Sequence, residues 1–181
     1  MARFSIRSCR EGDLPAVQAI YADAVLNGTA SFETAPPDLA EMTRRWRALR
    51  EGGFPYLVAV DEETVLGYAY AGPYRPRRAY RATVENSVYV AATARGLGVG
   101  RALLADLVAA ATQRGFRQMI AVIGDSANAA SIALHRGAGF AHVGTFRAVG
   151  WKHGRWLDSV LMQRALGAGD AEPLADGADS A

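Results

Sequence analysis

Three glycines alternate with other residues just before a predicted helix, at Gly96, Gly98 and Gly100. The stretch 99–115 repeats apolar residues at helical spacing, so the glycines form a loop that enters a helix N-terminus. Backbone N–H groups in such a loop face a ligand at the positive end of the helix dipole, with no Cβ in the way. The pattern predicts a phosphate-binding loop, and for this motif alone a plain strand-to-helix turn is an equal alternative.

The glycine spacing excludes two common nucleotide-binding loops. A Walker loop requires a Lys-Ser or Lys-Thr pair after the glycines, and none follows here. A dinucleotide fingerprint requires a third glycine where Arg101 stands. What remains is Arg95-x-x-Gly98-x-Gly100 after a strand, which calls for a different phosphorylated ligand.

A second polar pattern lies on the helix predicted over residues 127–138. Asn128, Ser131 and His135 are three and four residues apart, so they share one helix face. Taken alone, this pattern is better explained by an N-cap and a solvated face than by a binding site. Its position after the glycine loop is what favours a binding role.

Together the two motifs resemble those of the GCN5-related N-acetyltransferase (GNAT) superfamily. Arg95-x-x-Gly98-x-Gly100 is similar to its pyrophosphate loop, and Asn128-x-x-Ser131-x-x-Leu134-His135-x-x-x-Gly139-Phe140 is similar to its pantetheine motif. Within the superfamily, residues 31–33, 74–77, 83–90 and 150–158 resemble the phosphinothricin and methionine sulfoximine N-acetyltransferases. The resemblance implies transfer of the acetyl group of acetyl-CoA to the α-amine of a small amino acid or analogue.

Glu85 is the candidate general base for that reaction. An amino-acid ammonium must lose a proton before its nitrogen attacks a thioester. Glu85 precedes the segment that the resemblance pairs with pantetheine, although a lone strand glutamate more often lies on a solvated face. His135 stands where many family members have a tyrosine that protonates the departing thiolate, and it is expected to act as acid, as base or as a buried structural histidine.

Arg75 and Arg77 flank Pro76 in a predicted loop, and a guanidinium fork binds a carboxylate bidentately, so one or both are expected to hold the acceptor's α-carboxylate. The resemblance places Phe32, Glu33, Asn86 and Ser87 in the same pocket. A nucleic-acid patch is disfavoured because no supporting motif is present. The residues expected to contact acetyl-CoA are Val88, Tyr89, Val90, Arg95, Gly96, Leu97, Gly98, Val99, Gly100, Arg101, Asn128 and Ser131.

The 181 residues suit one domain, expected over residues 1–166 and followed by a disordered acidic tail over 167–181. The composition, 50% apolar and 21% charged with net charge +2, is ordinary for a globular protein. A lone Cys9 permits no internal disulfide and no zinc cluster, so no metal is expected. With no signal peptide and no apolar run of membrane length, a cytoplasmic protein without membrane or nucleic-acid partners is expected.

The predicted elements follow the order β-α-α-β-β-β-α-β-α-β-β. Asp13 is expected to cap the first helix, and Asp38 with Glu41 to form a capping box for the second. This order predicts an α/β fold with a mixed sheet and helices on both faces, and it resembles the GNAT fold with its mostly antiparallel central sheet. Strands are expected near residues 4–9, 56–60, 65–74, 83–90, 118–123, 140–150 and 156–163, and helices over 13–27, 38–51, 99–115 and 127–138.

Two alternative functions stay open at this point. One is the same transfer to another amine, a protein N-terminus or a polyamine, although the arginines at 75 and 77 disfavour a polyamine. The other is a CoA-binding module without catalysis, which would have no use for Glu85. Trp151 and Trp156 indicate either the interface of a homodimer, common in this family, or core packing.

Overall fold

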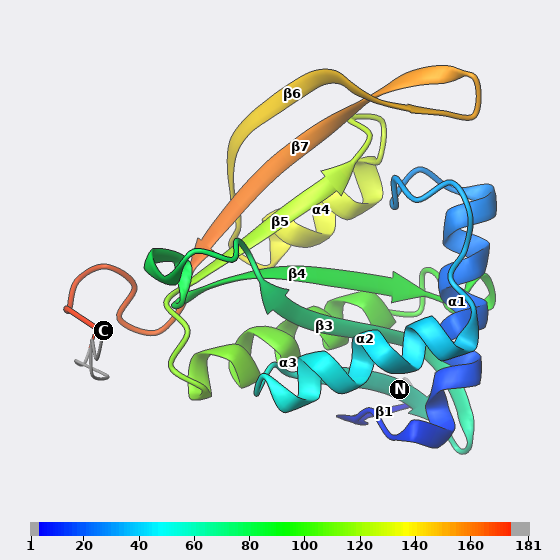
Figure 1. The fold of residues 1–181 in the computed structure, drawn as a ribbon, viewed down its shortest axis with the longest axis horizontal. Coiled ribbons are helices and arrows are strands. Elements are labelled where there is room, and N and C mark those ends of the chain that lie inside the picture. The colour runs from blue at the N-terminus through cyan, green and yellow to red at the C-terminus, as the bar shows by residue number, and fades with distance from the viewer. Residues whose placement is uncertain (1–3, 175–181) are drawn as a thin grey trace.

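The computed structural model describes residues 4–174, and its centre is a seven-stranded sheet. The strand order is β1-β2-β3-β4-β5-β7-β6 (Figure 1). Within the described residues, β4 and β5 form the one parallel pair, and the other neighbours are antiparallel. The strands are β1 Ser5–Ser8, β2 Tyr56–Asp61, β3 Thr64–Pro73, β4 Thr83–Val90, β5 Gln118–Gly124, β6 Ala141–Lys152 and β7 Arg155–Ala165.

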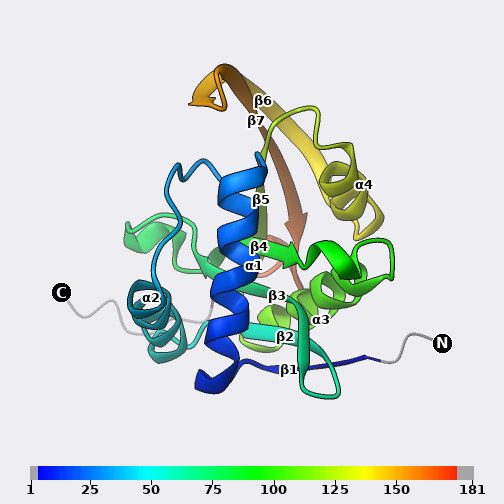
Figure 2. The same ribbon diagram turned by 90° about the vertical axis from the view of Figure 1, so that its right-hand side faces the viewer.

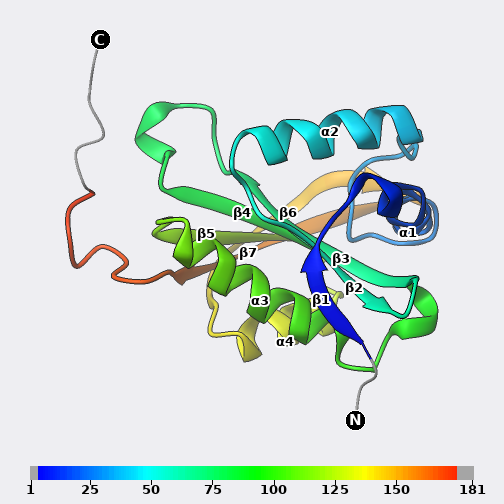
Figure 3. The ribbon, with the colours of Figure 1, turned by 90° about the horizontal axis from the view of Figure 1, so that it is seen from below.

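Helices cover both faces of this sheet, as predicted (Figure 3). α1 (Leu14–Asn27) and α2 (Leu39–Glu51) pack on one face, and α3 (Val99–Gln113) and α4 (Ala129–Gly137) on the other. The first face buries Trp46 and Tyr68 in its core, and the second buries Leu103 and Leu107. A fully buried side chain of this size contributes about 1.5–3 kcal/mol by the removal of apolar surface from water, so both layers hold the sheet in place.

The helix starts differ in part from the predictions. Asp13 does not cap α1 with its side chain; its carboxylate instead accepts hydrogen bonds from the Arg7 guanidinium and the Arg10 backbone at 2.7 Å. The reason is a short 3₁₀ turn, Glu11–Asp13, which places the carboxylate before the helix. Asp38 does cap α2, accepting from the Glu41 backbone N–H at 2.8 Å.

The second half of the predicted capping box is replaced by ion pairs. The Glu41 carboxylate binds the guanidinium groups of Arg44 and Arg45, at 2.7 and 2.8 Å. These arginines lie one helical turn further on, within easy reach of the side chain. At α4, Asn128 accepts from the Ser131 backbone N–H at 3.2 Å and acts as the N-cap, so this helix begins at Ala129 rather than at residue 127.

The parallel strands β4 and β5 form a fork. Their pairing runs only from Thr83 with Gln118 to Asn86 with Ala121. Beyond that point β4 continues to Val90 and β5 to Gly124. Because β4 remains paired with β3 along its other edge, the fork exposes one edge of β4 at the carboxyl end of both strands.

The β6–β7 hairpin rises from the sheet edge away from the helices (Figure 2). Trp151 and Trp156 pack edge to face on it, with ring centroids 5.3 Å apart, and are 58% and 62% exposed. The prediction that these tryptophans pack in the core is therefore wrong, and the dimer interface stays a prediction. Other exposed apolar side chains of β6 are Val143, Phe146 and Val149.

The chain after β7 forms turns in its described part. The Gly169 N–H donates to the Leu166 carbonyl at 2.9 Å, and Glu172 lies 3.9 Å from Arg117. The rest of the predicted tail, 175–181, lies outside the described residues, so the tail and the domain limit at residue 166 stay predictions. None of the helices in the described chain has both the length and the apolar character needed to cross a membrane.

Candidate active site

A groove of about 1430 Å³ lies between α3 and α4 and reaches the fork. Of the predicted cofactor contacts, Leu97 is not in the groove wall; its side chain is 59% exposed. Arg164 and Gly139, which sequence reasoning missed, line the groove as well. The predicted contacts that line it are Val88, Tyr89, Val90, Arg95, Gly96, Gly98, Val99, Gly100, Arg101, Asn128 and Ser131.

The glycine loop has the backbone shape that its sequence predicts. Gly96 and Gly98 have φ values of 80° and 85°, in the left-handed region that favours glycine. Gly98 is the N-cap of α3, and no side chain caps this helix. The first backbone N–H groups of α3 are thus left for an anion at the positive end of the helix dipole.

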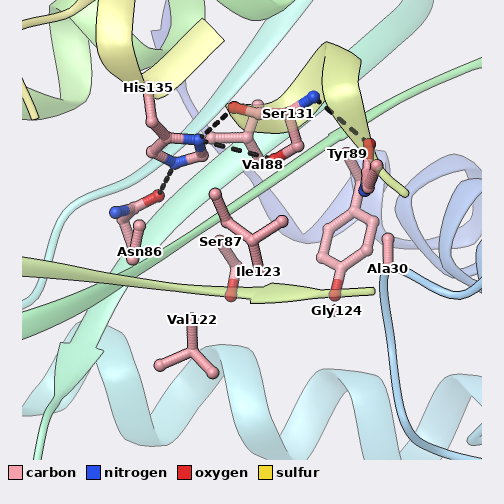
Figure 4. Close-up of a pocket in the computed structure, with 12 residues that line it drawn as sticks. Ala30, Asn86, Ser87, Val88, Tyr89, Val122, Ile123, Gly124, Ser131 and His135 are labelled. Carbon is pink, nitrogen blue, oxygen red and sulfur yellow. Dashed lines mark hydrogen bonds between the residues drawn. The ribbon is translucent and has the colours of Figure 1, made fainter. Parts of the chain in front are cut away.

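A small cavity of about 50 Å³ occupies the fork, and we call it the window (Figure 4). It shares Val88 and Tyr89 with the groove wall, so the two spaces adjoin. Residues of β4, β5 and α4 line it together with Ala30, which lines the groove as well. The window therefore lies where a ligand in the groove would reach the edge of β4. The other lining residues are Asn86, Ser87, Ala121, Val122, Ile123, Gly124, Asn128, Ser131 and His135.

His135 lines the window, but protein atoms contact both of its ring nitrogens (Figure 4). Its Nε2 lies 2.9 Å from Oδ1 of Asn86, and its Nδ1 lies 2.8 Å from the Ser131 carbonyl oxygen. The Asn86 amide is oriented in turn by donation from its Nδ2 to the Ile120 carbonyl at 3.0 Å. Burial lowers the pKa of His135, and the hydrogen bond to Ser131 opposes that shift. The ring therefore connects α4 to the point where β4 and β5 part.

Glu85 lies on the opposite face of the sheet from His135. Strand alternation places it with Ser87 and Tyr89, as predicted, and the Tyr89 ring meets Tyr21 of α1 at 5.0 Å between centroids. Val84 and Val88, which alternate with these residues along β4, pack into the core on the α3 side. Burial raises the pKa of Glu85, and the positive charge of Arg75 counteracts the rise. A partly desolvated carboxylate of this kind is suited to accept a proton near neutral pH.

The predicted carboxylate clamp is an exposed loop beside Glu85. The Arg75 guanidinium lies over the Tyr74 ring, 5.0 Å from its centroid. Its charge acts on Glu85, so this arginine is on the acceptor side of the sheet. Pro76 and Arg77 follow in the same exposed loop, and Arg77 precedes the short 3₁₀ turn Arg78–Tyr80. The structure thus brings Arg75 together with Glu85 and leaves the loop open to a ligand.

The segment between α1 and α2, residues 28–37, carries the predicted acceptor contacts Phe32 and Glu33, and we call it the acceptor loop. Its Glu33 carboxylate accepts from Tyr21 at 3.1 Å and from Arg45 at 2.7 Å, so it is held by both flanking helices. Phe32 is 39% exposed, and its ring lies against Gly150 of β6. The loop therefore crosses the face of the sheet that carries Glu85, with Ala30 at the window.

Sequence reasoning missed several polar groups on that face. Tyr70 lies opposite Ser87 in the β3–β4 ladder, and the Ser87 hydroxyl limits the rise in the pKa of Tyr70 that burial causes. Lys152 at the end of β6 is buried and donates to the Ser31 carbonyl at 2.7 Å. Strand alternation could have placed Tyr70 on this face, whereas nothing local to Lys152 marks its partner 121 residues away.

A nucleotide thioester suits this geometry, because its phosphates fit the N-terminus of α3 while its thioester reaches the exposed edge of β4. A protein built in this way is an acyl-CoA-dependent acyltransferase. The acetyltransferase (GNAT) domain family matches residues 6–161, and the chain belongs to this family. The fold and family expected from the sequence are therefore confirmed.

Individual relatives are close to this chain. A phosphinothricin N-acetyltransferase of Alcaligenes faecalis is 54% identical over 166 residues, which are 92% of this chain and 84% of that protein. An L-methionine sulfoximine/L-methionine sulfone acetyltransferase of Pseudomonas paraeruginosa is 47% identical over 163 residues, 90% of this chain and 94% of that protein.

Two solved structures have the same fold. The phosphinothricin acetyltransferase of Sinorhizobium meliloti in complex with AcCoA has a TM-score of 0.94 at 47% identity, covering 98% of this chain and 96% of that one. The ribosomal-protein-alanine N-acetyltransferase of Brucella melitensis has a TM-score of 0.87 at 48% identity, covering 90% and 99%. The names of the relatives thus include both free amino-acid analogues and a protein as acceptors.

Proposed function

We propose that this enzyme transfers the acetyl group of acetyl-CoA to the α-amine of a small amino acid or analogue of the phosphinothricin or methionine sulfoximine type. The observation that carries the proposal is the window, which adjoins the groove on the α3 and α4 side and lies beside the β4 face that carries Glu85. Relatives at 47–54% identity that bear these substrate names support the acceptor class.

The chemistry is a direct attack. Glu85 removes a proton from the acceptor ammonium, directly or through water, and the neutral nitrogen then bonds to the thioester carbonyl carbon. Backbone N–H groups along the unpaired edge of β4 between Ser87 and Val90 stabilise the negative charge that develops on the carbonyl oxygen. Collapse breaks the C–S bond, the sulfur takes up the excess proton of the nitrogen, and CoA thiol and the N-acetyl product leave while Glu85 returns its proton to solvent. Cys9 is buried on the far side of β2 from the fork and takes no part.

His135 acts in this scheme as a positioning residue, because both of its ring nitrogens already face protein oxygens. His135→Gln keeps a hydrogen-bond donor for Asn86, whereas His135→Leu leaves the buried Asn86 amide oxygen without one. The glutamine variant should therefore have the higher kcat. The difference should be roughly 10-fold or more, the usual cost of an unsatisfied buried polar group. Steady-state kinetics with both variants test this, and equal losses would instead make the imidazole the proton donor.

The glycine loop should control acetyl-CoA affinity alone. Gly98→Ala forces a side chain into φ near 85°, although the added Cβ meets nothing within 4 Å. Such a left-handed residue costs about 1–2 kcal/mol, so the dissociation constant for acetyl-CoA should rise roughly tenfold. Calorimetry measures this, and Gly115→Ala, with a φ of 83° and open space around it at the end of α3, is the matched control. Unchanged affinity in Gly98→Ala would remove the loop from the phosphate site.

An acceptor screen tests the proposal as a whole. Thiol release from acetyl-CoA is measured with methionine sulfoximine, methionine sulfone, phosphinothricin and free amino acids, and with a peptide that has an N-terminal alanine. Turnover of the free amino acids with little turnover of the peptide is expected, because the exposed Arg75, whose charge acts on Glu85, favours an acceptor whose carboxylate is close to its amine. Preference for the peptide would support the second candidate, protein N-terminal acetylation, which the Brucella neighbour suggests.

The remaining expectations concern the assembly and the cell. We propose a homodimer that covers the exposed apolar side chains of β6, and a cytoplasmic location. The exposure of Trp151 and Trp156 supports the dimer. In the part of the chain that the structure describes, no group of three or more His, Cys, Asp and Glu is arranged to hold a metal, and the chemistry above requires none.

A further inference from the structure

Lys152, the last residue of β6, is a buried cation that the reaction scheme does not use. It is 5% exposed, which is rare for lysine unless the ammonium has a partner. Its Nζ donates to the backbone carbonyl of Ser31 at 2.7 Å. This contact joins the β6–β7 hairpin to the acceptor loop across 121 residues of sequence.

Ser31 is the centre of the acceptor loop's hydrogen bonds. Its side-chain oxygen contacts the Tyr21 hydroxyl at 2.9 Å and accepts from the Glu33 backbone N–H at 3.2 Å. With its carbonyl held by Lys152, this residue is 7% exposed. A shift of Ser31 would therefore move Phe32 and Glu33 together.

The hairpin holds the loop in two further ways. His153, beside Lys152, lies with its Nε2 3.2 Å from the Gly28 carbonyl at the start of the loop. A Cβ on Gly150 would lie 2.5 Å from the Phe32 ring, and one on Gly124 would lie 2.2 Å from the Thr29 carbonyl. The loop thus lies directly on bare backbone of β5 and β6, with no room for a side chain beneath it.

Electrostatics agree with this arrangement. Burial lowers the pKa of Lys152, and the negative charge of Glu33 counteracts that shift. Glu33 also acts on Tyr70 and Tyr89, whose pKa values burial raises. Glu33, the charged residue of the loop, is therefore close to Tyr70 and Tyr89, on the face where the acceptor is expected.

We propose that Lys152 is a positioning residue for acceptor binding: it fixes the acceptor loop over the window through the Ser31 carbonyl. The inference rests on the proposed function for its kinetic consequence, but the loop contact exists without any substrate. Lys152 acts mainly on the acceptor side, because the acetyl-CoA groove is formed chiefly by α3, α4 and the edge of β4 and meets the acceptor loop at Ala30.

Lys152→Met tests this, since methionine has a similar length and no donor. Loss of a hydrogen bond to a charged group should raise the acceptor KM about tenfold or more, with the KM for acetyl-CoA within about twofold of wild type. Hydrogen exchange of the peptide spanning residues 28–37 should be about tenfold faster in this variant without ligands. Lys152→Arg retains a charged donor and should restore most of both properties.

Two further variants distinguish loss of the contact between Lys152 and Ser31 from a general loss of stability. Arg147→Met removes an exposed cation of the same strand, 75% exposed, that pairs with Asp158 rather than with the loop, and it should leave both KM values unchanged. Gly150→Ala pushes the Phe32 ring without touching Lys152 and should reproduce the acceptor-specific rise in KM. If Lys152→Met does not fold, Gly150→Ala still shows whether a displaced acceptor loop raises the KM for the acceptor alone.

Unchanged exchange over residues 28–37 in Lys152→Met would overturn the inference, and so would an equal rise in both KM values. If the wild-type enzyme acetylates no free amino acid, the proposed function fails instead. The exchange measurement then still decides whether Lys152 holds the loop.

Discussion

Glu85→Gln should lower kcat by about 10²- to 10⁴-fold, the usual contribution of a positioned general base. Glutamine has nearly the same shape but cannot take up a proton, so the acceptor nitrogen stays protonated and does not attack. The KM for the acceptor should change little, and the dissociation constant for acetyl-CoA should not change, because Glu85 does not line the groove. Thiol release from acetyl-CoA measures kcat and KM, and calorimetry measures the dissociation constant.

The pH profile gives a second readout for the same residue. Burial raises the pKa of Glu85, so the carboxylate becomes protonated at a higher pH than an ordinary glutamate. Only the ionised form accepts a proton, and kcat/KM of the wild type should therefore fall as pH decreases through that raised pKa. This acidic limb should disappear from the residual activity of Glu85→Gln.

Glu63→Gln is the matched control, since Glu63 is an exposed residue in the turn between β2 and β3. It should have the kcat and pH profile of the wild type. Wild-type turnover in Glu85→Gln, or an acidic limb that survives the substitution, would remove Glu85 from the reaction.

Arg75→Ala should raise the KM for a carboxylate-bearing acceptor roughly 10- to 100-fold while kcat stays within a few-fold. The guanidinium lies over the Tyr74 ring and its charge acts on Glu85, and its loss removes a charged hydrogen-bond donor for the acceptor's carboxylate. The effect on Glu85 has a defined sign as well. Without the positive charge the pKa of Glu85 rises further, so the acidic limb of the pH profile moves to higher pH.

The amine that corresponds to the acceptor without its carboxylate distinguishes a clamp from a general disturbance. It should be a poor substrate for wild type and Arg75→Ala alike, with little difference between them. Arg81→Ala, which removes an exposed arginine at the end of the same loop, is the control and should leave KM unchanged. An equal loss with both acceptors in Arg75→Ala would reject carboxylate recognition by this residue.

The sequence predicts best those parts of the site that lie within one short segment. The glycines at 96 and 98 and the apolar repeat of α3 are adjacent in the chain, and local spacing defines both the loop and the helix. Alternation along β4 likewise places Glu85, Ser87 and Tyr89 on one face. These features depend on backbone geometry alone.

Contacts between distant segments could not be predicted in this way. His135 was expected near the thioester, but its contact with Asn86, 49 residues earlier, depends on how α4 packs behind the fork. The same holds for Lys152 and Ser31, and for Trp151 and Trp156, whose exposure follows from the place of the hairpin at the sheet edge. Asp13 shows the limit on a smaller scale, because an arginine six residues earlier in the chain competes for its carboxylate.

The fork between β4 and β5 also bears on how the two substrates meet. The groove and the window adjoin at Val88 and Tyr89, and Ala30 of the acceptor loop lines both spaces. Direct transfer would therefore take place with both molecules bound in adjoining spaces. An inhibitor that joins CoA covalently to an amino acid would fill the groove and the window together, and it should bind more tightly than either half alone.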